Sequence, residues 1–420
     1  MKKKIASLLV ATLFSTLVLT ACGETVAPAN AGNTTQTQET ADTNAADAED
    51  TAQAEASVAD TDAAEVEETT EETKDYGTLS VAFPTGNIRI AIDILALQLG
   101  YFEEEGVTVQ PVNIKGNDAL TAINEGSEQL DILTVGFVPD LQALASGYDL
   151  CFVAGTAVEG GALIAKKGSA VNYQSGDTII DLNAIADAKL GFVRNESAWV
   201  VTRQYLLDHG VSEDTIKAIE DENAGSITYY GEETEVAQAV QKGEIEVGFL
   251  PMEYALLYAD AYELEVIAAS GDLQPNYVCC REVTSPAKLN AKKDAFVAYE
   301  TARIRAWEYY KQGETDDTVK ADVVKIVTDY SGKEADYVET YLYGGVTKYS
   351  ADPNAKGIAK YVLAAYNSGA LSSSDIDFGT YDIAQNIDTS AYKTALDNLV
   401  AKNADNAFYK ELQELYTESN

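Results

Sequence analysis

Beyond residue 75, the first part of the chain alternates short apolar runs with segments whose apolar residues recur at helical spacing. The short runs are bounded by glycines or acidic residues, which is typical of strands, and the segments between them are typical of helices. The predicted strands are 78–84, 107–114, 130–135 and 150–154, and the predicted helices are 88–99, 118–125 and 139–146. Strands that alternate with helices indicate an open α/β sheet.

The same alternation restarts after a stretch rich in Gly, Ser and Asn near 166–176, which predicts a second lobe of similar construction. The predicted strands of this lobe are 189–194, 227–230 and 246–250, and its predicted helices are 198–209 and 235–242. A further short strand at 278–281 is expected to return the chain to the first lobe.

From residue 289 onward the apolar spacing is mostly helical, and aromatic residues such as Trp307, Tyr309 and Tyr310 fall where a helix buries one face. The predicted helices there are 294–311, 318–330, 334–342 and 354–367. The roughly 345 residues from Tyr76 to Asn420 exceed what one hydrophobic core normally serves. We therefore expect a first lobe at 76–166 and 270–420 and a second lobe at 167–269.

Residues 1–22 have the pattern of a bacterial export signal. Three lysines precede an apolar run at 5–20, which is too short and wrongly flanked to cross a membrane. The run ends in Leu19-Thr20-Ala21-Cys22, the pattern of a lipoprotein processing site. We expect Cys22 to become the first mature residue and to carry a lipid, with two or more acyl chains giving stable anchoring. This predicts a location at the outer face of the cytoplasmic membrane.

Residues 23–75 consist mainly of Ala, Thr, Glu, Asp, Gln and Asn, so they cannot bury enough apolar surface to fold. We predict a disordered acidic tether. The whole chain has 68 acidic and 29 basic residues, a net charge of −39, which argues against binding to nucleic acid. It also disfavours adherence to anionic lipid headgroups, so the lipid is expected to be the only membrane contact.

Several short motifs occur in an order typical of a known family. The run LGYFEEEGVTV at 99–109 is followed by AINEG at 122–126 and LDI at 130–132. AVQKGEIEV at 239–247 repeats the second step, with Glu246 in place of the usual aspartate. In combination these motifs resemble ABC-transporter substrate-binding proteins of the nitrate, sulfonate, taurine and thiamine-precursor group. The resemblance covers about 78–311.

The resemblance implies the type II periplasmic-binding-protein fold, an α/β fold whose two lobes close on a ligand, here with a helical C-terminal region. It implies a monomeric solute-binding component that works with the permease and ATPase subunits of an ABC importer. The expected ligand is a small organic anion, such as a sulfonate or taurine, or a small heteroaromatic molecule resembling a pyrimidine thiamine precursor. A sensor or surface-binding lipoprotein with the same fold is the alternative.

An enzyme is not expected. Relatives that make the thiamine pyrimidine require histidine and a cysteine-rich motif, whereas this chain has one histidine, His209, placed at a predicted helix end where it suits the helix dipole. The sequence contains no Cys/His metal spacing, phosphate-binding loop or nucleophile elbow. We accordingly expect no cofactor and no metal.

Ligands of open α/β sheets bind beyond the carboxyl ends of the strands, which selects loops in both lobes. In the first lobe this rule selects Asn87, Arg89, Gly136, Phe137 and Thr156. Backbone N–H groups in these loops suit an anion, Arg89 adds positive charge, and Phe137 is able to stack on a planar ligand. Asn87 and Arg89 equally suit a helix end or a solvent-facing position.

In the second lobe the same rule selects Asn195, Ser197, Trp199, Glu253 and Tyr254. Asn195 or Ser197 is expected to cap a helix whose free N–H groups point at the cleft. Trp199 is either a platform for the ligand or a core residue. Glu253 either accepts a hydrogen bond from the ligand or is a carboxylate in the first turn of a helix.

Two adjacent cysteines, Cys279 and Cys280, allow either a vicinal disulfide or a pair of partly buried thiols. Cys151 opens an apolar strand and is expected to lie in the core. With Cys22 lipidated, three cysteines remain, so they cannot all pair within one chain.

Overall fold

The computed structural model describes residues 74–194, 196–371 and 376–420. All of these residues belong to one compact unit that begins at Thr70. The export signal, Cys22 and nearly all of the tether lie outside the described residues. Among the helices that the structure describes, none is long and apolar enough to cross a membrane.

The first lobe contains two sheets, one of two strands and one of three. β1 pairs with β2 in parallel, and β11 pairs antiparallel with both β3 and β4. The strands of this lobe are β1 (Thr78–Ala82), β2 (Thr108–Val112), β3 (Leu133–Gly136), β4 (Cys151–Gly155) and β11 (Cys280–Thr284). The helices between them are α1 (Ala91–Gln98), α2 (Tyr101–Glu104), α3 (Gly116–Asn124), α4 (Phe137–Ala145) and α11 (Pro286–Ala291).

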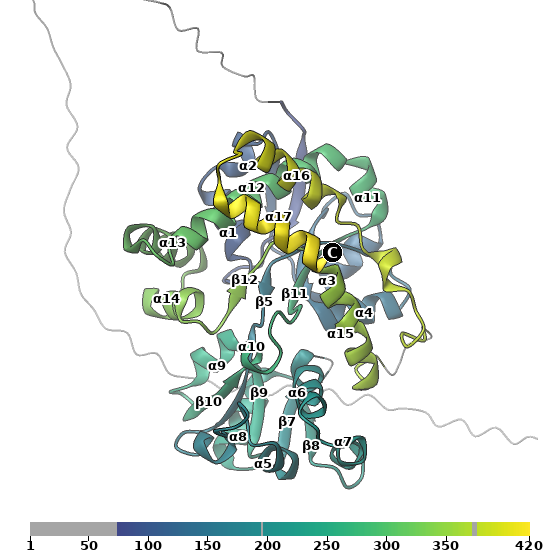
Figure 1. Cartoon of the computed structure of the whole chain (residues 1–420), viewed down its shortest axis with the longest axis vertical. Coiled ribbons are helices and arrows are strands. Elements are labelled where there is room, and N and C mark those ends of the chain that lie inside the picture. Colours follow the sequence, from purple (N-terminus) through teal and green to yellow (C-terminus); the bar gives the residue numbers. More distant parts are fainter. Residues whose placement is uncertain (1–73, 195, 372–375) are drawn as a thin grey trace, which may run out of the picture. The chain divides into compact units, whose positions relative to one another are not determined.

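The second lobe is built on a five-stranded sheet of order β10-β6-β9-β7-β8, whose labelled strands lie side by side in Figure 1. Its strands are β6 (Gly161–Lys166), β7 (Leu190–Val193), β8 (Ile227–Tyr230), β9 (Val247–Pro251) and β10 (Leu264–Ala269). Its helical segments are η1 (Ala170–Tyr173), α5 (Leu182–Asp187), α6 (Ser197–Asp208), α7 (Glu213–Glu220), α8 (Glu233–Lys242), α9 (Met252–Tyr258) and α10 (Ser270–Leu273). The structure is thus the two-lobed α/β fold that the sequence predicts.

The second sheet begins earlier than the boundary expected at residue 167. β6 pairs antiparallel with both β9 and β10, and five of its six residues are buried. Because this strand is buried on both faces, it lacks the alternation of polar and apolar residues that marks a half-exposed strand. For the same reason the sequence pattern did not predict β6.

The chain passes between the lobes twice, once between β4 and β6 and once between α10 and β11. On the first passage β5 (Ala157–Val158) pairs with β12 (Lys348–Tyr349) from the C-terminal region. On the second, Tyr277 and Val278 are fully buried, so this passage is part of the core. Two short passages, close to the same point, are suited to a hinge.

The C-terminal region is helical and packs on the first lobe, as the spacing predicts. Its segments are α12 (Lys293–Gln312), α13 (Asp317–Ser331), α14 (Ala335–Tyr343), α15 (Ala355–Asn367), η2 (Ile383–Asn386), α16 (Ser390–Lys402) and α17 (Ala407–Ser419). Figure 1 shows α16 and α17, at the yellow end of the colour range, beside α12. Trp307 and Tyr310 are buried, which confirms their predicted packing role.

A buried charge cluster joins α12 to the first lobe. The guanidinium of Arg303 lies 2.8 Å from Asp93 of α1, 3.0 Å from Glu282 of β11 and 2.9 Å from Glu300 of its own helix. All four side chains are almost completely buried. Burial raises the pKa of the Glu282 carboxyl, while Arg303 acts against that rise. The cluster fixes the orientation of α12 because any displacement leaves a charge without its partner.

The motif residues have the structural roles expected of them. Gly100 and Gly106 adopt positive φ values of 76° and 83°, as tight turns at helix ends require. A side chain at Gly106 would also lie 1.8 Å from the Lys74 carbonyl oxygen. Asp131 is buried and accepts a hydrogen bond of 2.9 Å from the backbone N–H of Ser80, which joins β3 to β1. These residues have structural roles and are not among the residues that line the cleft described below.

Candidate functional site

A cleft lined by residues of both lobes lies where the two chain passages meet. It consists of a cavity of about 360 Å³ and a neighbouring cavity of about 320 Å³. The two cavities share the lining residues Arg89, Gly116, Val135, Gly136 and Cys280, so they adjoin. This volume suits a small organic molecule.

Three helices begin at the cleft without a side-chain cap. α3 contributes Gly116 and Asn117, α4 contributes Gly136 at its N-cap, and α6 contributes Glu196 at its N-cap and Ser197. The helices contain 9, 9 and 12 residues. The positive ends of their dipoles therefore face one small space, an arrangement that favours an anion. In α4 the Phe137 N–H already donates to the Cys279 carbonyl at 2.9 Å, and Pro139 has no N–H, so this helix contributes mainly its dipole.

Arg89 supplies a positive charge and links the two lobes. Its Nε donates to Oε2 of Glu253 at 2.6 Å, and its Nη2 donates to Oε1 of the same carboxylate. Burial works against the charge of Arg89, but Glu253 outweighs that effect and raises the pKa of the guanidinium. Because Arg89 comes from the loop after β1 and Glu253 from α9, this bidentate pair spans the cleft.

The chain around this pair holds both partners in place. The Asn87 side chain accepts a hydrogen bond of 2.9 Å from the Arg89 backbone N–H. Thr156 donates to the Arg89 carbonyl at 3.3 Å. On the other side, the Tyr337 hydroxyl donates to the Glu253 carbonyl at 3.0 Å. The pair is therefore preorganised before any ligand enters.

A second carboxyl group, that of Glu196, lines the smaller cavity. Burial and the neighbouring charge of Glu233 raise its pKa to about 7, while Arg89 acts in the opposite direction. Near neutral pH Glu196 therefore exchanges between a neutral form that donates a hydrogen bond and a charged form that only accepts.

Two thiols complete this wall of the cleft. The Sγ atoms of Cys279 and Cys280 lie 3.6 Å apart, and both residues are unpaired thiols in the structure. A hydrogen bond from Cys280 and the charge of Arg89 outweigh burial and lower the pKa of Cys279 to about 7. The same hydrogen bond and burial raise the pKa of Cys280.

Six of the residues selected from the sequence line this cleft. They are Asn87, Arg89, Gly136, Ser197, Glu253 and Tyr254. They come from both lobes and from loops at the carboxyl ends of β1, β3, β7 and β9. Contact of these residues with a ligand stays a prediction.

Three other selected residues lie among the packed side chains instead of the cleft lining. Phe137 is fully buried against Phe152, with ring centroids 5.8 Å apart. The Trp199 indole stacks on Phe192 and donates to Glu220 at 2.7 Å, which satisfies its only polar group. Thr156 is fully buried and acts through the Arg89 carbonyl. Asn195 lies outside the described residues.

The sequence reasoning overlooked several lining residues. Lys115 and Asn117 follow β2, so the rule on carboxyl ends of strands, applied to that strand too, selects them. Lys333 lies in the connection between α13 and α14, and Tyr337 lies in α14, where no local sequence pattern indicates a role in the cleft.

Other residues have the local roles expected of them. His209 follows the last residue of α6, its Nδ1 donates to the Tyr205 carbonyl at 2.9 Å, and its ring stacks on the Tyr205 ring. Cys151 is buried in β4, which confirms its predicted place in the core.

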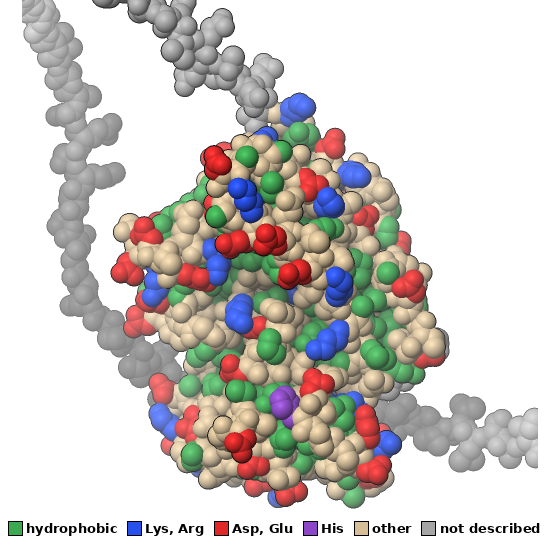
Figure 2. Space-filling view, in the orientation of Figure 1, with side chains coloured by type: hydrophobic (Ala, Val, Ile, Leu, Met, Phe, Trp, Pro, Cys, Tyr) green, Lys and Arg blue, Asp and Glu red, His purple; other side chains and the backbone are tan. Residues whose placement is uncertain are grey.

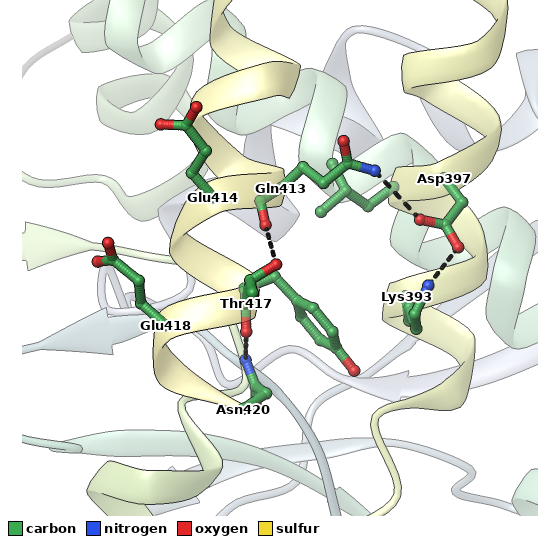
Figure 3. A pocket seen from close by; sticks show the side chains of 9 residues that line it. Lys393, Asp397, Gln413, Glu414, Thr417, Glu418 and Asn420 are labelled. Atoms are coloured by element: carbon green, nitrogen blue, oxygen red, sulfur yellow. Dashed lines mark hydrogen bonds and ion pairs between the residues drawn. The ribbon is translucent and has the colours of Figure 1, made fainter.

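A separate surface hollow between α16 and α17 is a weaker candidate. Figure 3 shows that its polar groups bond to one another, with Asp397 between Lys393 and Gln413. These side chains are exposed and come from one region of the chain. On the face shown in Figure 2, acidic and basic side chains are interspersed and do not form a patch of one sign.

The chain is similar to known binding proteins in sequence and in fold. Residues 117–322 match the family described as the periplasmic substrate-binding protein of phosphonate ABC transporters. A search by sequence among curated proteins finds no match.

Solved structures of binding proteins share the fold at low sequence identity. The periplasmic nitrate-binding protein of Synechocystis PCC 6803 aligns with a TM-score of 0.58 at 12% identity, over 79% of this chain and 91% of that one. The periplasmic aliphatic sulphonate-binding protein of Escherichia coli gives 0.55 at 16% identity, over 76% and 99%. The alkanesulfonate-binding protein of Xanthomonas axonopodis pv. citri, bound to MOPS, gives 0.53 at 16% identity, over 74% and 97%.

Proposed function

We propose that this chain is a periplasmic substrate-binding protein of an ABC importer, as the family match over residues 117–322 suggests, and that its cleft captures a small organic acid with a sulfonate or phosphonate group. One observation carries the proposal: three helices without side-chain caps begin around the same cavity, next to Arg89. The acid group binds at these helix starts, and Arg89 donates to its oxygens.

The second lobe gives the ligand's other end a distinct environment. Glu253 and Glu196 both line the cleft, so an amine or hydroxyl on the ligand finds an acceptor there. A taurine-like molecule, with an acid at one end and an amine at the other, matches both groups of residues. Such a ligand replaces each half of the Arg89–Glu253 pair with a new partner and holds the lobes together.

A planar heteroaromatic ligand is the weaker candidate. The two aromatic residues expected to stack on it, Phe137 and Trp199, are packed into the core. Arg89 faces the cleft, whereas the exposed Arg194 packs over the Tyr229 ring at 4.8 Å. Phe249, Tyr254, Tyr277 and Tyr337 also line the cleft, but the charge of Arg89 there favours an acid.

A thermal-shift screen tests the ligand class. The full-length chain carrying Cys22→Ser is heated with methanesulfonate, taurine, alkylphosphonates, nitrate or pyrimidines. A ligand present at 100 times its dissociation constant stabilises the protein by about 2.7 kcal/mol. Stabilisation by sulfonates or phosphonates supports the proposal, and stabilisation by pyrimidines alone overturns it.

We further propose that Cys22 carries a lipid and that residues 23–75 tether the binding unit to the membrane as a monomer. The support is the apolar run and processing pattern that precede Cys22, together with the acidic composition that follows it. Metabolic labelling with a fatty-acid analogue tests this, since Cys22→Ser removes the label if the lipid is attached there. Label that persists in the variant contradicts the proposal.

A further inference from the structure

Two adjacent thiols stand where the chain returns from the second lobe to the first. Cys279 precedes β11 and Cys280 is its first residue. Both line the smaller cavity, with Cys279 partly exposed and Cys280 buried. Their Sγ atoms are 3.6 Å apart, so an approach of about 1.5 Å in all reaches the length of a disulfide bond.

The surroundings favour a reaction at Cys279. Gly160 lies against its sulfur, and a side chain there would come within 3.2 Å of Sγ. The hydrogen bond from the Cys280 thiol and the charge of Arg89 stabilise a thiolate at this sulfur. Cys151, by contrast, is buried, and burial raises the pKa of its thiol to about 12, so it stays unreactive.

We propose that Cys279 and Cys280 form a redox-active dithiol that reacts with small disulfides of the glutathione class and closes to a vicinal disulfide in the wall of the ligand cleft. The Cys279 thiolate attacks one sulfur of the small disulfide, forms a mixed disulfide and releases one thiolate. Cys280 then loses its proton to solvent and attacks Sγ of Cys279, which releases the second small thiol. Two protein thiols are oxidised and one small disulfide is reduced to two thiols.

The rate advantage of Cys279 follows from its environment. With its pKa at about 7, half of it is thiolate at pH 7, whereas an ordinary thiol with a pKa of 9.0 is about 1% thiolate. Nucleophilicity falls as the pKa falls, with a Brønsted slope of about 0.4–0.5, which removes six- to tenfold of that gain. Cys279 should therefore react roughly five to eight times faster than an ordinary accessible thiol.

Closing the dithiol changes the charge of the cleft. The thiolate of Cys279 is one of the negative groups that act on Arg89 and Glu196. A disulfide has no such charge, and it fixes the peptide at the entrance to β11. The oxidised and reduced proteins therefore present different cleft walls to the same ligand.

The test uses the full-length chain with Cys22→Ser, treated with oxidised glutathione and then alkylated. Trypsin cleaves after Lys242 and Arg281, so residues 243–281 carry both cysteines on one peptide, separate from Cys151. The proposal predicts a peptide that has lost two hydrogens and resists alkylation until it is reduced. A peptide with two free thiols, two glutathionyl groups or a link to another chain overturns it.

Single variants test the order of attack. Cys280→Ser should stop at a stable glutathionyl adduct on Cys279. Cys279→Ser should react more slowly than the parent chain by at least the five- to eightfold factor above, because Cys280 is buried. Cys151→Ala is the matched control and should close at the parent rate. Faster reaction of Cys280 than of Cys279 contradicts the assigned roles, and the result on the parent chain does not depend on the variants folding.

Discussion

Replacing Glu253 by Gln separates the charge of the inter-lobe pair from its shape. In the ligand-free cleft Arg89 is bound by both oxygens of Glu253, so an anionic ligand has to compete with a carboxylate for the guanidinium. The side chains are 29% and 17% exposed, which keeps the pair largely out of solvent. A hydrogen bond to a charged group contributes about 1.5–3 kcal/mol and a neutral one about 0.5–1.5 kcal/mol.

The expected gain for a simple anion is therefore about 1–1.5 kcal/mol, or roughly five- to tenfold in the dissociation constant. Taurine should gain less or lose affinity, because the same substitution removes the acceptor for its amine. Isothermal titration of methanesulfonate and taurine at fixed salt measures both effects.

Glu105→Gln is the matched control for this experiment. Glu105 pairs with Arg305 at 2.6 Å, with side-chain exposures of 21% and 25%, and neither residue lines the cleft. This substitution should leave both affinities unchanged. Weaker binding of methanesulfonate to the Glu253→Gln protein, or equal changes for both ligands, would show that Glu253 does not compete with an anion for Arg89.

Three further substitutions test other parts of the account. Arg303→Met leaves three buried carboxylates without their counter-charge and should lower the free energy of unfolding by about 3–5 kcal/mol, measured by urea denaturation. Glu196, with its pKa raised to about 7, should make binding of anions tighter as the pH falls through 7, and Glu196→Gln should flatten that dependence in titrations between pH 6 and about 8. Because its pKa is raised in the folded protein, Glu196 stabilises the fold at low pH, and this stabilisation is lost as the pH rises through about 7. Thermal melts of the parent chain and of Glu196→Gln over this pH range measure the loss. Gly106→Ala should destabilise the fold more than Gly147→Ala, because both sites have positive φ but only the first lacks room for a side chain, and the difference in melting temperature measures this.

The alternation of apolar runs and helical spacing was sufficient to predict most elements that pack with one face in the core. It gave no range for several helices, among them α7, α16 and α17. It also missed β6, Gly161–Lys166, and β10, Leu264–Ala269, which are neighbours in the second sheet. β6 is buried on both faces, and β10 starts directly after α9 and a turn without a clear boundary residue. Such strands are defined by their partners in the sheet, which a local pattern does not contain.

The sequence predicted those residues of the candidate site whose positions follow from the order of the strands and helices. Loops at the carboxyl ends of strands brought Arg89, Gly136 and Glu253 together, because the order of the elements places those ends at one cleft. The direction of a side chain at the start of a helix depends on tertiary packing, so Trp199 entered the core beside Phe192. Tyr337 reaches the cleft from a distant helix, a contact that only the folded chain reveals.

We propose that an acid group binds at the starts of α3, α4 and α6 beside Arg89. A crystal structure of the protein grown with methanesulfonate tests it most directly. We expect the sulfonate oxygens to lie within hydrogen-bonding distance of Arg89 and of backbone N–H groups at those helix starts. A sulfonate bound elsewhere, or an empty cleft in which Arg89 still pairs with Glu253 at saturating ligand, would contradict it.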